Sequence, residues 1–287
     1  MQPVSVDHYE NFPVASWLCP PGLRSSIVAI YGFARTADDL ADEGDAPATQ
    51  RLADLWAFRA DLSMIETGGQ PSERWRAVFE PLAEVIAQRQ LPVSLLHDLL
   101  SAFEQDVIKS RYEDRAELLD YCRRSANPVG RLLLHLYGIR GNASLEQSDA
   151  ICSALQLINF WQDLSVDTSR DRLYLPQVDI DAHGVSQQQL LDRQDSPAVR
   201  ALVADVTAWA RTLMLQGAPL VHTIPGRGGW ELRFVVQGGL RIIDKIERMN
   251  HATLNARPHI GKLDAPWLLW RAAGMRRPKP TLTGKMA

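Results

Sequence analysis

The chain of 287 residues is long enough for one large domain or two small ones, and its 46% hydrophobic and 23% charged residues are typical of a globular protein. The net charge of −3 excludes a global attraction to nucleic acid, so local cations or a metal must hold any anionic ligand. No run of about 18 uncharged apolar residues occurs, which excludes an ordinary transmembrane helix.

The cysteines and the opening residues indicate the compartment. Cys19, Cys122 and Cys152 are odd in number and lie in apolar stretches, which favours reduced thiols in a core. The opening residues have neither the basic nor the apolar region of a secretory signal. We therefore expect a cytoplasmic protein. If its substrate is a membrane lipid, the protein reaches that lipid from the bilayer surface, as a peripheral protein.

Helical periodicity dominates the chain, and alternating strand patterns are essentially missing. Glycine and proline fall between the periodic segments, where helices are expected to stop. The predicted helices cover Ser25–Asp42, Ala48–Glu66, Glu73–Gln90, Val93–Ile108, Ala116–Tyr137, Leu145–Val166, Pro197–Leu215 and Trp230–Asn250. With no fixed repeat and no long linker, the pattern favours one compact all-α domain.

The first predicted helix is apolar on every side except for one polar stripe. The members of this stripe, at i, i+4, i+7 and i+11 and within an arc of roughly 60°, are Tyr31, Arg35, Asp38 and Asp42. Unpaired carboxylates are costly in a dry core, so the stripe must face a polar cavity, a partner or a metal. The alternative is a surface helix end with solvated acids, because the sequence continues as DDLADEGD.

The predicted helix at 116–137 contains Pro128. Proline removes a backbone hydrogen bond inside a helix, so we expect a kink that opens room along a chain-binding cavity. In the alternative, Asn127 and Pro128 end one helix and begin another.

The predicted helix at 145–166 repeats the construction of the first. Its polar stripe, at i, i+3, i+7 and i+11 and within roughly 80°, consists of Gln156, Asn159, Asp163 and Asp167. The flanking positions are apolar. One Asp-x-x-x-Asp pair is weak evidence, because such pairs are common on solvated faces. Two pairs, each on an otherwise apolar helix, argue strongly against solvated faces.

Two segments depart from the helical pattern. Residues 168–184 contain RDRLYLPQVDIDAHG, which is too irregular for a helix and rich in functional groups. Residues 271–287 are basic and contain proline, and we expect a disordered tail there. The simplest interpretation of this tail is a solvated one, and the alternative is attachment to an anionic membrane surface.

Two acidic stripes suit one kind of chemistry. Carboxylate and amide oxygens are the hard ligands that Mg²⁺ prefers, and Mg²⁺ binds through one or two carboxylates plus substrate phosphates. Opposed acidic helices can hold a diphosphate through Mg²⁺ ions, which act as Lewis acids during C–O ionisation. The sequence has no P-loop, no Gly-x-Gly-x-x-Gly, no Gly-x-Ser-x-Gly and no zinc spacing.

In combination, the motifs resemble the squalene/phytoene synthase family, the head-to-head prenyltransferases, from His8 to about Glu247. The matching segments, in order, are HYENFPVAS, YGFARTADDLAD, YCRRSANPVG, LQLINFWQDLSVD, RDRLYLP and FVVQGGLRIIDKI. HYENFPVAS, NPVGRLLLHLYG and NFWQDLSVD resemble most the hopanoid-biosynthesis branch of hydroxysqualene synthases (HpnC). The resemblance implies a single-domain, isoprenoid synthase-type helical bundle with a central cavity over residues 1–270.

The resemblance also implies roles for single residues. The expected Mg²⁺ ligands are Asp38, Asp42, Asp163, Asp167 and Asn159. The expected diphosphate-binding residues are Arg35, Arg172, Tyr31, Asn159, Gln156 and Tyr174, and the expected catalytic residues are Tyr121, Asp38, Asp163 and Tyr31. Tyr121 has the alternative of a packing aromatic, and Tyr174 that of a flap anchor.

One residue departs from the family pattern. Many members have arginine immediately before the second motif's first aspartate, where this chain has Gln162. We therefore expect Arg35 and Arg172 to carry more of the anion binding.

The implied reaction is Mg²⁺-dependent ionisation of presqualene diphosphate, rearrangement of the carbocation and capture by water, which gives hydroxysqualene and diphosphate. Other enzymes of the pathway are further expected partners, and nucleic acid is not. The alternatives are a squalene synthase, a presqualene diphosphate synthase, or a phytoene-type synthase acting on farnesyl or geranylgeranyl diphosphate. A non-catalytic assembly protein is a more distant alternative, because it should have lost part of the metal set.

Overall fold

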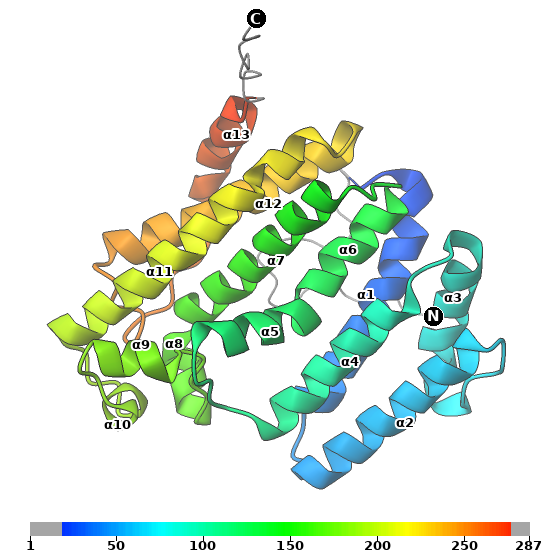
Figure 1. Ribbon diagram of the computed structural model, residues 1–287, viewed down its shortest axis with the longest axis horizontal. Helices are drawn as coiled ribbons and strands as arrows, with labels where there is room; N and C mark the ends of the chain where they lie inside the picture. Colours follow the sequence, from blue (N-terminus) through cyan, green and yellow to red (C-terminus); the bar gives the residue numbers. More distant parts are fainter. Residues whose placement is uncertain (1–18, 277–287) are drawn as a thin grey trace, which may run out of the picture.

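The computed structural model describes residues 19–276, which form a bundle of helices without a β-strand in that range (Figure 1). The longer helices are α1 (Pro21–Asp42), α2 (Ala48–Glu66), α3 (Arg76–Arg89), α4 (Val93–Ile108), α5 (Arg115–Ser125), α6 (Asn127–Leu136), α7 (Asn142–Gln162), α11 (Pro197–Gly217), α12 (Gly226–Arg248) and α13 (Ala265–Gly274). The shorter ones are η1 (Glu73–Trp75), α8 (Leu164–Asp167), η2 (Thr168–Arg170), α9 (Gln177–Ala182), α10 (Gln187–Leu191), η3 (Ala218–His222) and η4 (Lys262–Asp264). The predicted all-α fold class is confirmed.

Short polar contacts fix several helix ends. The side chains of Asp114 and Ser196 accept hydrogen bonds from backbone N–H groups in the first turns of α5 and α11. At the C-terminal end of α1, the side chain of Arg51 donates hydrogen bonds to the carbonyl oxygens of Ala41 and Gly44, both at 2.6 Å. A cation that satisfies carbonyl groups at a helix C-terminus also interacts favourably with the helix dipole. The end of α1, which bears Asp42, is therefore held in place.

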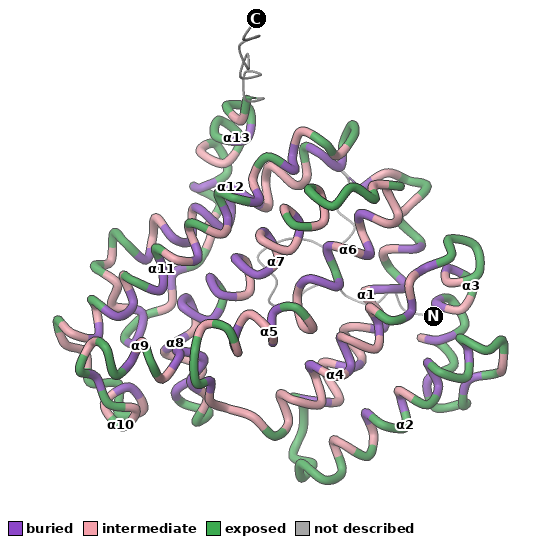
Figure 2. The backbone as a smooth tube through the Cα atoms, viewed as in Figure 1, coloured by how far each residue is buried: buried purple, intermediate pink, exposed green. Residues whose placement is uncertain are grey.

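The apolar faces of the helices form two clusters. In the first, α1, α2 and α3 contribute Phe33, Phe58 and Phe79, which are fully buried and pack ring against ring. The second is built around α7, which contacts α5, α6, α11 and α12. Figure 2 shows buried residues gathered on the helix sides that face neighbouring helices. Because α1 belongs to the first cluster and α7 to the second, the two acidic stripes project from different parts of the core.

The helices α7 and α11 approach each other closely at Gly217. A Cβ atom on Gly217 would lie 2.5 Å from the carbonyl oxygen of Gln147 and 2.9 Å from the backbone nitrogen of Ile151. Any side chain there would push the two backbones apart. Gly130 on α6 plays a similar part, since a Cβ there would lie 2.6 Å from Sγ of Cys152. Glycine thus allows α11 to approach the backbone of α7, and α6 to approach side chains of α7.

The predicted kink at Pro128 was wrong. The chain forms two helices, α5 and α6, which meet at Ala126, and Pro128 lies in the first turn of α6. A proline fits this turn without loss, because the N–H groups of the first turn have no partner within the helix. The alternative interpretation, in which Asn127 and Pro128 begin a new helix, is the observed one.

The predicted continuous helix at 145–166 was also wrong at its end. The helix α7 stops at Gln162, and Asp163 has φ −100° and ψ 11°, outside the helical region. The single turn α8 then carries Asp167. The irregular segment at 168–184 forms η2, a left-handed residue at Asp171 and the short helix α9.

At the C-terminal end, the predicted domain boundary after residue 270 falls inside α13, so disorder was a wrong prediction for residues 271–274. The guanidinium of Arg233 donates to the carbonyl oxygens of Ala272 (3.0 Å) and Met275 (2.7 Å), which holds the end of this helix. Residues 277–287 of the predicted tail lie outside the described residues.

Over residues 19–276, no helix has both the length and the apolarity of a membrane span.

Candidate active site

The polar stripe of α1 forms as the sequence predicts, but its arginine is engaged along its own helix. Nη2 of Arg35 lies 2.7 Å from Oδ1 of Asp39 and 2.8 Å from Oε1 of Glu43, and Nη1 lies 3.6 Å from Oδ2 of Asp38. Tyr31 is half-buried one turn earlier. An anion that binds Arg35 therefore competes with three carboxylates.

The end of α1 meets the loop that follows the second motif. Arg172 donates a hydrogen bond to Asp42, and Nη1 of Arg170 lies 3.6 Å from the other carboxylate oxygen of Asp42. A pocket of about 360 Å³ opens at this junction. Its lining residues are Ala41, Asp42, Ala48, Arg51, Asp106, Val107, Arg170 and Arg172. The predicted residues Asp42 and Arg172, which are 130 residues apart in the sequence, are thus brought together.

The carboxylates around this junction repel one another. Burial, together with Asp42 and other nearby acids, raises the pKa of Asp38 to about 6, against the opposing effect of Arg35. Burial and the neighbouring Asp163 raise the pKa of Asp167 to about 7, although Arg172 opposes the shift. These partly buried carboxylates repel one another, so a bound cation would stabilise them.

The second motif has a cationic partner that the sequence analysis missed. Arg257 donates through Nε and Nη2 to the two carboxylate oxygens of Asp163, with 3.1 Å for the Nη2 contact. Burial raises the pKa of Asp163, and the ion pair with Arg257 opposes that shift. Arg257 lies 94 residues downstream, in a segment without any recognised motif, so local spacing could not reveal it.

Gln162 explains how Arg257 comes to lie there. The Gln162 side chain is buried, and its Nε2 donates to the carbonyl oxygen of Pro258 at 2.7 Å. This bond ties the end of α7 to the segment that carries Arg257. From the sequence, we expected Gln162 to mean the loss of a diphosphate-binding cation at this place. The fold instead places the guanidinium of Arg257 on Asp163, the residue next to Gln162.

Tyr121 on α5 contacts an acid that was not predicted. Its hydroxyl donates to Oδ2 of Asp106 on α4 at 2.9 Å, and Oδ1 of Asp106 is buried without a hydrogen-bond partner. Burial raises the pKa of Asp106 to about 7, against the hydrogen bond from Tyr121 and the charge of Arg172. The only signal in the sequence was that Asp106 is one of three acids on α4, and acids on a helix are too common to be specific.

Four buried aromatic rings lie beside these acids. Tyr174 stacks on Phe160 with ring centroids 3.7 Å apart and planes 7° apart. Tyr112 lies 5.6 Å from Tyr121 and 5.9 Å from Tyr174, again between ring centroids. The stacking holds the loop after η2 against α7, so Tyr174 anchors this loop. The π-faces offer an apolar surface that can also attract a cation.

The first half of the second stripe stands apart from these contacts. Gln156 is half-buried and the side chain of Asn159 is exposed, and among residues 19–276 no hydrogen bond joins either side chain to another predicted site residue. Within the same range, no three Asp, Glu, His or Cys side chains lie close enough to hold one metal ion. A magnesium site here has to include phosphate oxygens, as Mg²⁺ sites commonly do.

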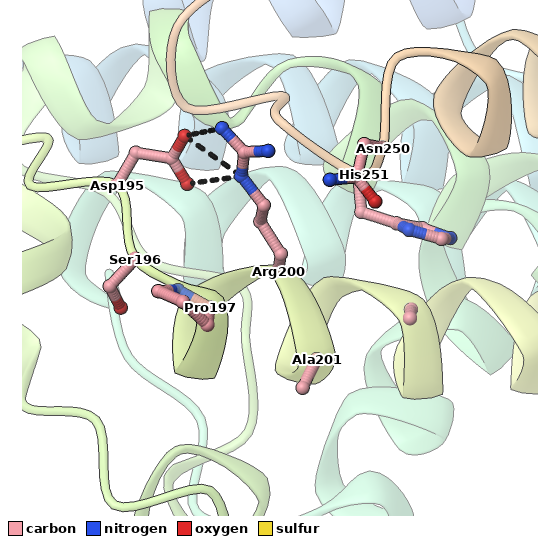
Figure 3. A pocket seen from close by; sticks show the side chains of 8 residues that line it. Asp195, Ser196, Pro197, Arg200, Ala201, Asn250 and His251 are labelled. Carbon is pink, nitrogen blue, oxygen red and sulfur yellow. Dashed lines mark hydrogen bonds and ion pairs between the residues drawn. The ribbon is translucent and has the colours of Figure 1, made fainter.

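A larger pocket, of about 550 Å³, lies elsewhere and has no predicted site residue in its lining (Figure 3). It is lined by Asp195, Ser196, Pro197, Arg200, Ala201, Ala204, Asn250 and His251. The guanidinium group of Arg200, which lines this pocket, already forms a bidentate ion pair with Asp195. The smaller pocket at Asp42 is therefore the candidate active site.

The chain is similar to known proteins over most of its length. The model of the squalene/phytoene synthase family matches residues 6–264. This chain belongs to the squalene/phytoene synthase family. The family membership and the helical fold predicted from the motifs are thus confirmed.

Individual members of the squalene/phytoene synthase family align over most of the chain. Hydroxysqualene synthase from Rhodopseudomonas palustris is 35% identical over 257 residues, which cover 89% of this chain and 85% of that protein. Hydroxysqualene synthase from Sinorhizobium fredii is 36% identical over 258 residues, with 89% and 85% covered. The crystal structure of squalene synthase HpnC from Alicyclobacillus acidocaldarius superposes with a TM-score of 0.78 at 33% identity, covering 85% of this chain and 90% of that one.

Proposed function

We propose that this protein is a hydroxysqualene synthase of squalene and hopanoid biosynthesis, which converts presqualene diphosphate and water to hydroxysqualene and diphosphate. The main support is the junction of the first aspartate motif with the loop that follows the second, where Arg172 pairs with Asp42 at a pocket lined by two aspartates and three arginines, beside buried aromatic rings. The two relatives that share this name and align over 89% of the chain support the same reaction.

Mg²⁺ is the proposed cofactor, and the residues present fit it. The proposed ligands are Asp38, Asp42, Asp163, Asp167 and Asn159. Three of these carboxyls, on Asp38, Asp163 and Asp167, have a raised pKa chiefly because of burial, so positive charge would stabilise their ionised forms. When bound, Mg²⁺ supplies the charge that neutralises the diphosphate leaving group.

Arginines next to these acids would hold the diphosphate. Arg172 and Arg257 are now paired with Asp42 and Asp163, and each is placed to exchange a carboxylate oxygen for a phosphate oxygen. Arginine suits this exchange because its planar fork binds either group with two hydrogen bonds. The further proposed diphosphate contacts are Arg35, Tyr31, Gln156, Asn159 and Tyr174.

The aromatic rings would guide the carbocation. We assign Tyr121 as a catalytic residue, with Tyr31, Asp38 and Asp163, because its hydroxyl is oriented by Asp106 and its ring lies in the buried aromatic group. The ring faces of Tyr121, Phe160 and Tyr174 would stabilise positive charge and exclude bulk water until capture. Addition of water to the cation releases one proton, and Asp106 offers a buried carboxylate whose pKa is raised to about 7.

One second candidate is supported by an observation. The similar Alicyclobacillus acidocaldarius structure is named a squalene synthase, so the cation could be reduced rather than hydrated. A presqualene diphosphate synthase or a phytoene-type synthase would instead couple two prenyl diphosphates. A silent assembly protein has least support, because all four motif aspartates are present.

A product assay separates these reactions. Purified protein with Mg²⁺ is given either presqualene diphosphate or farnesyl diphosphate, with and without NADPH, and the products are identified by mass spectrometry. We expect hydroxysqualene from presqualene diphosphate, no need for NADPH, and no product from farnesyl diphosphate alone. A product from farnesyl diphosphate alone would contradict the proposal.

The proposed location is cytoplasmic with peripheral membrane contact, and the proposed partners are the substrate and pathway enzymes.

A further inference from the structure

The outer face of α13 is apolar and exposed. Pro266, Leu269, Trp270 and Ala273 fall within an arc of about 100° on this helix. Leu269 is 57% exposed, Trp270 is 70% exposed, and Leu263 on the preceding turn η4 is 95% exposed. We call these five side chains the α13 face. A group of large apolar side chains that project together into solvent marks an interaction surface.

The opposite side of α13 is firmly attached to α12. Trp267 lies between the guanidinium groups of Arg241 and Arg271, which are 4.8 and 5.5 Å from its ring centroid. Ala272 is fully buried.

The preceding turn η4 is attached equally firmly. The buried carboxylate of Asp264 accepts from Arg241 at 2.7 Å and pairs with Nζ of Lys245 at 2.7 Å. Together with the capping of the α13 C-terminus by Arg233, these contacts hold η4 and α13 in one orientation. The apolar side chains are therefore displayed outward by a fixed helix.

The charges around the α13 face are almost all positive. Lys262 and Arg276 are exposed at its two ends, and Arg271 is exposed beside it. The one acid of η4 and α13, Asp264, is buried and neutralised by its two cationic partners. In sequence, the basic residues Arg277, Lys279 and Lys285 follow. This concentration is local, since the whole chain has a net charge of −3.

An exposed tryptophan and leucines between basic residues have the chemistry of a helix that lies in a membrane interface. The apolar side chains enter the boundary between headgroups and acyl chains, and the cations attract anionic headgroups. In Figure 1, α13 stands out from the bundle at the top of the view, well away from α8. Contact through this face therefore leaves the pocket at Asp42 uncovered.

We propose that the α13 face docks the protein on a bilayer surface rich in anionic phospholipid. The α13 face would be the peripheral contact for an enzyme whose substrate is itself a lipid. The binding does not depend on which product the active site forms, so the two proposals can fail separately.

Co-sedimentation of the full chain with vesicles tests this proposal. The vesicles consist of phosphatidylcholine alone or of phosphatidylcholine with phosphatidylglycerol. We expect binding to the anionic vesicles, weakened by high salt, and at least tenfold weaker binding without phosphatidylglycerol. The double variant Leu269→Ser/Trp270→Ser should weaken binding about tenfold or more, because each lost side chain removes a large buried apolar group. Lys262→Glu/Arg276→Glu should weaken it by a similar factor through charge.

The matched control is Trp56→Ser, because Trp56 on α2 is 59% exposed and belongs to a different part of the surface. This variant should bind vesicles as the wild type does. Circular dichroism spectra and melting curves should agree among all four proteins, which excludes unfolding as the cause. Equal binding by the Leu269/Trp270 variant, or no binding by the wild type, would overturn the proposal. So would a wild-type dimer in light scattering that becomes a monomer in this variant, since the face would then bind a second copy.

Discussion

The two aspartate motifs look alike in sequence and differ in structure. The first lies on one uninterrupted helix, where Arg35 pairs with Asp38 three residues away, while Asp42 pairs with Arg172 from the loop after the second motif. The second is broken at Asp163, and its neutralising cation, Arg257, comes from a distant segment. Helix geometry alone brings the residues of the first motif onto one face. The second motif gains its cation only when the segment around Arg257 packs against the end of α7.

The largest expected effect tests whether both motifs act in one site. Asp38→Asn and Asp163→Asn should each lower kcat by roughly 10²- to 10³-fold, because each removes a charge that supports ionisation of the diphosphate. Turnover is measured on presqualene diphosphate, with far-ultraviolet circular dichroism as the check on folding. The control is Asp45→Asn, an exposed acid just beyond α1, which should keep full activity. Full activity in the Asp38→Asn/Asp163→Asn double variant would refute the mechanism.

A second prediction concerns the cation that completes the second motif. Arg257→Ala should raise KM for the diphosphate substrate roughly 10- to 100-fold, since it removes an anion-binding fork and leaves Asp163 unpaired. Arg257→Lys should restore part of the loss, because it keeps the charge but not the fork. Arg248→Ala, at an exposed position in the last turn of α12, is the control and should leave KM unchanged. An unchanged KM in Arg257→Ala would show that the distant cation has no part in binding.

Gln162 should act through Arg257, with a smaller effect. Gln162→Leu removes the bond to Pro258 and leaves a buried carbonyl group unpaired, at a cost of about 1–3 kcal/mol in the free energy of unfolding. KM should rise several-fold in the wild-type background. In the Arg257→Ala background the same substitution should still lower stability but should hardly change KM. Additive effects on KM would mean that Gln162 and Arg257 act independently.

The smallest effect concerns pH and the buried acid on α4. In the folded protein the pKa of Asp106 is raised to about 7, so without metal this group lowers stability as pH rises from about 4 to 7. Asp106→Asn removes that titration. Measured without divalent metal, its melting temperature should exceed that of the wild type at pH 8 and match it near pH 4. The same difference at both pH values would rule out titration of Asp106 as the cause.

Features that depend on residues close together in the sequence could be predicted, and features that depend on contacts between distant segments could not. The stripes of α1 and α7 were visible because a helix places residues three, four and seven apart on one face. The break at Asp163 was not, because the segment is apolar on both sides and contains no glycine or proline. Arg257 and Asp106 join the site through contacts between distant segments, and such contacts leave no periodic signal. The family resemblance supplied the ligand class, which residue spacing alone could not provide.

The close contact at Gly217 has a consequence for motion. Because backbone atoms of α7 and α11 nearly touch there, α7 cannot shift along its axis without moving α11 as well. Amide hydrogens in the middle of α7 should therefore exchange with deuterium among the slowest in the protein, and those of the 163–175 segment much faster. The rate of substrate entry would then depend on motion of the segment that carries Arg172, while the helix α7, which carries the second motif, stays rigid.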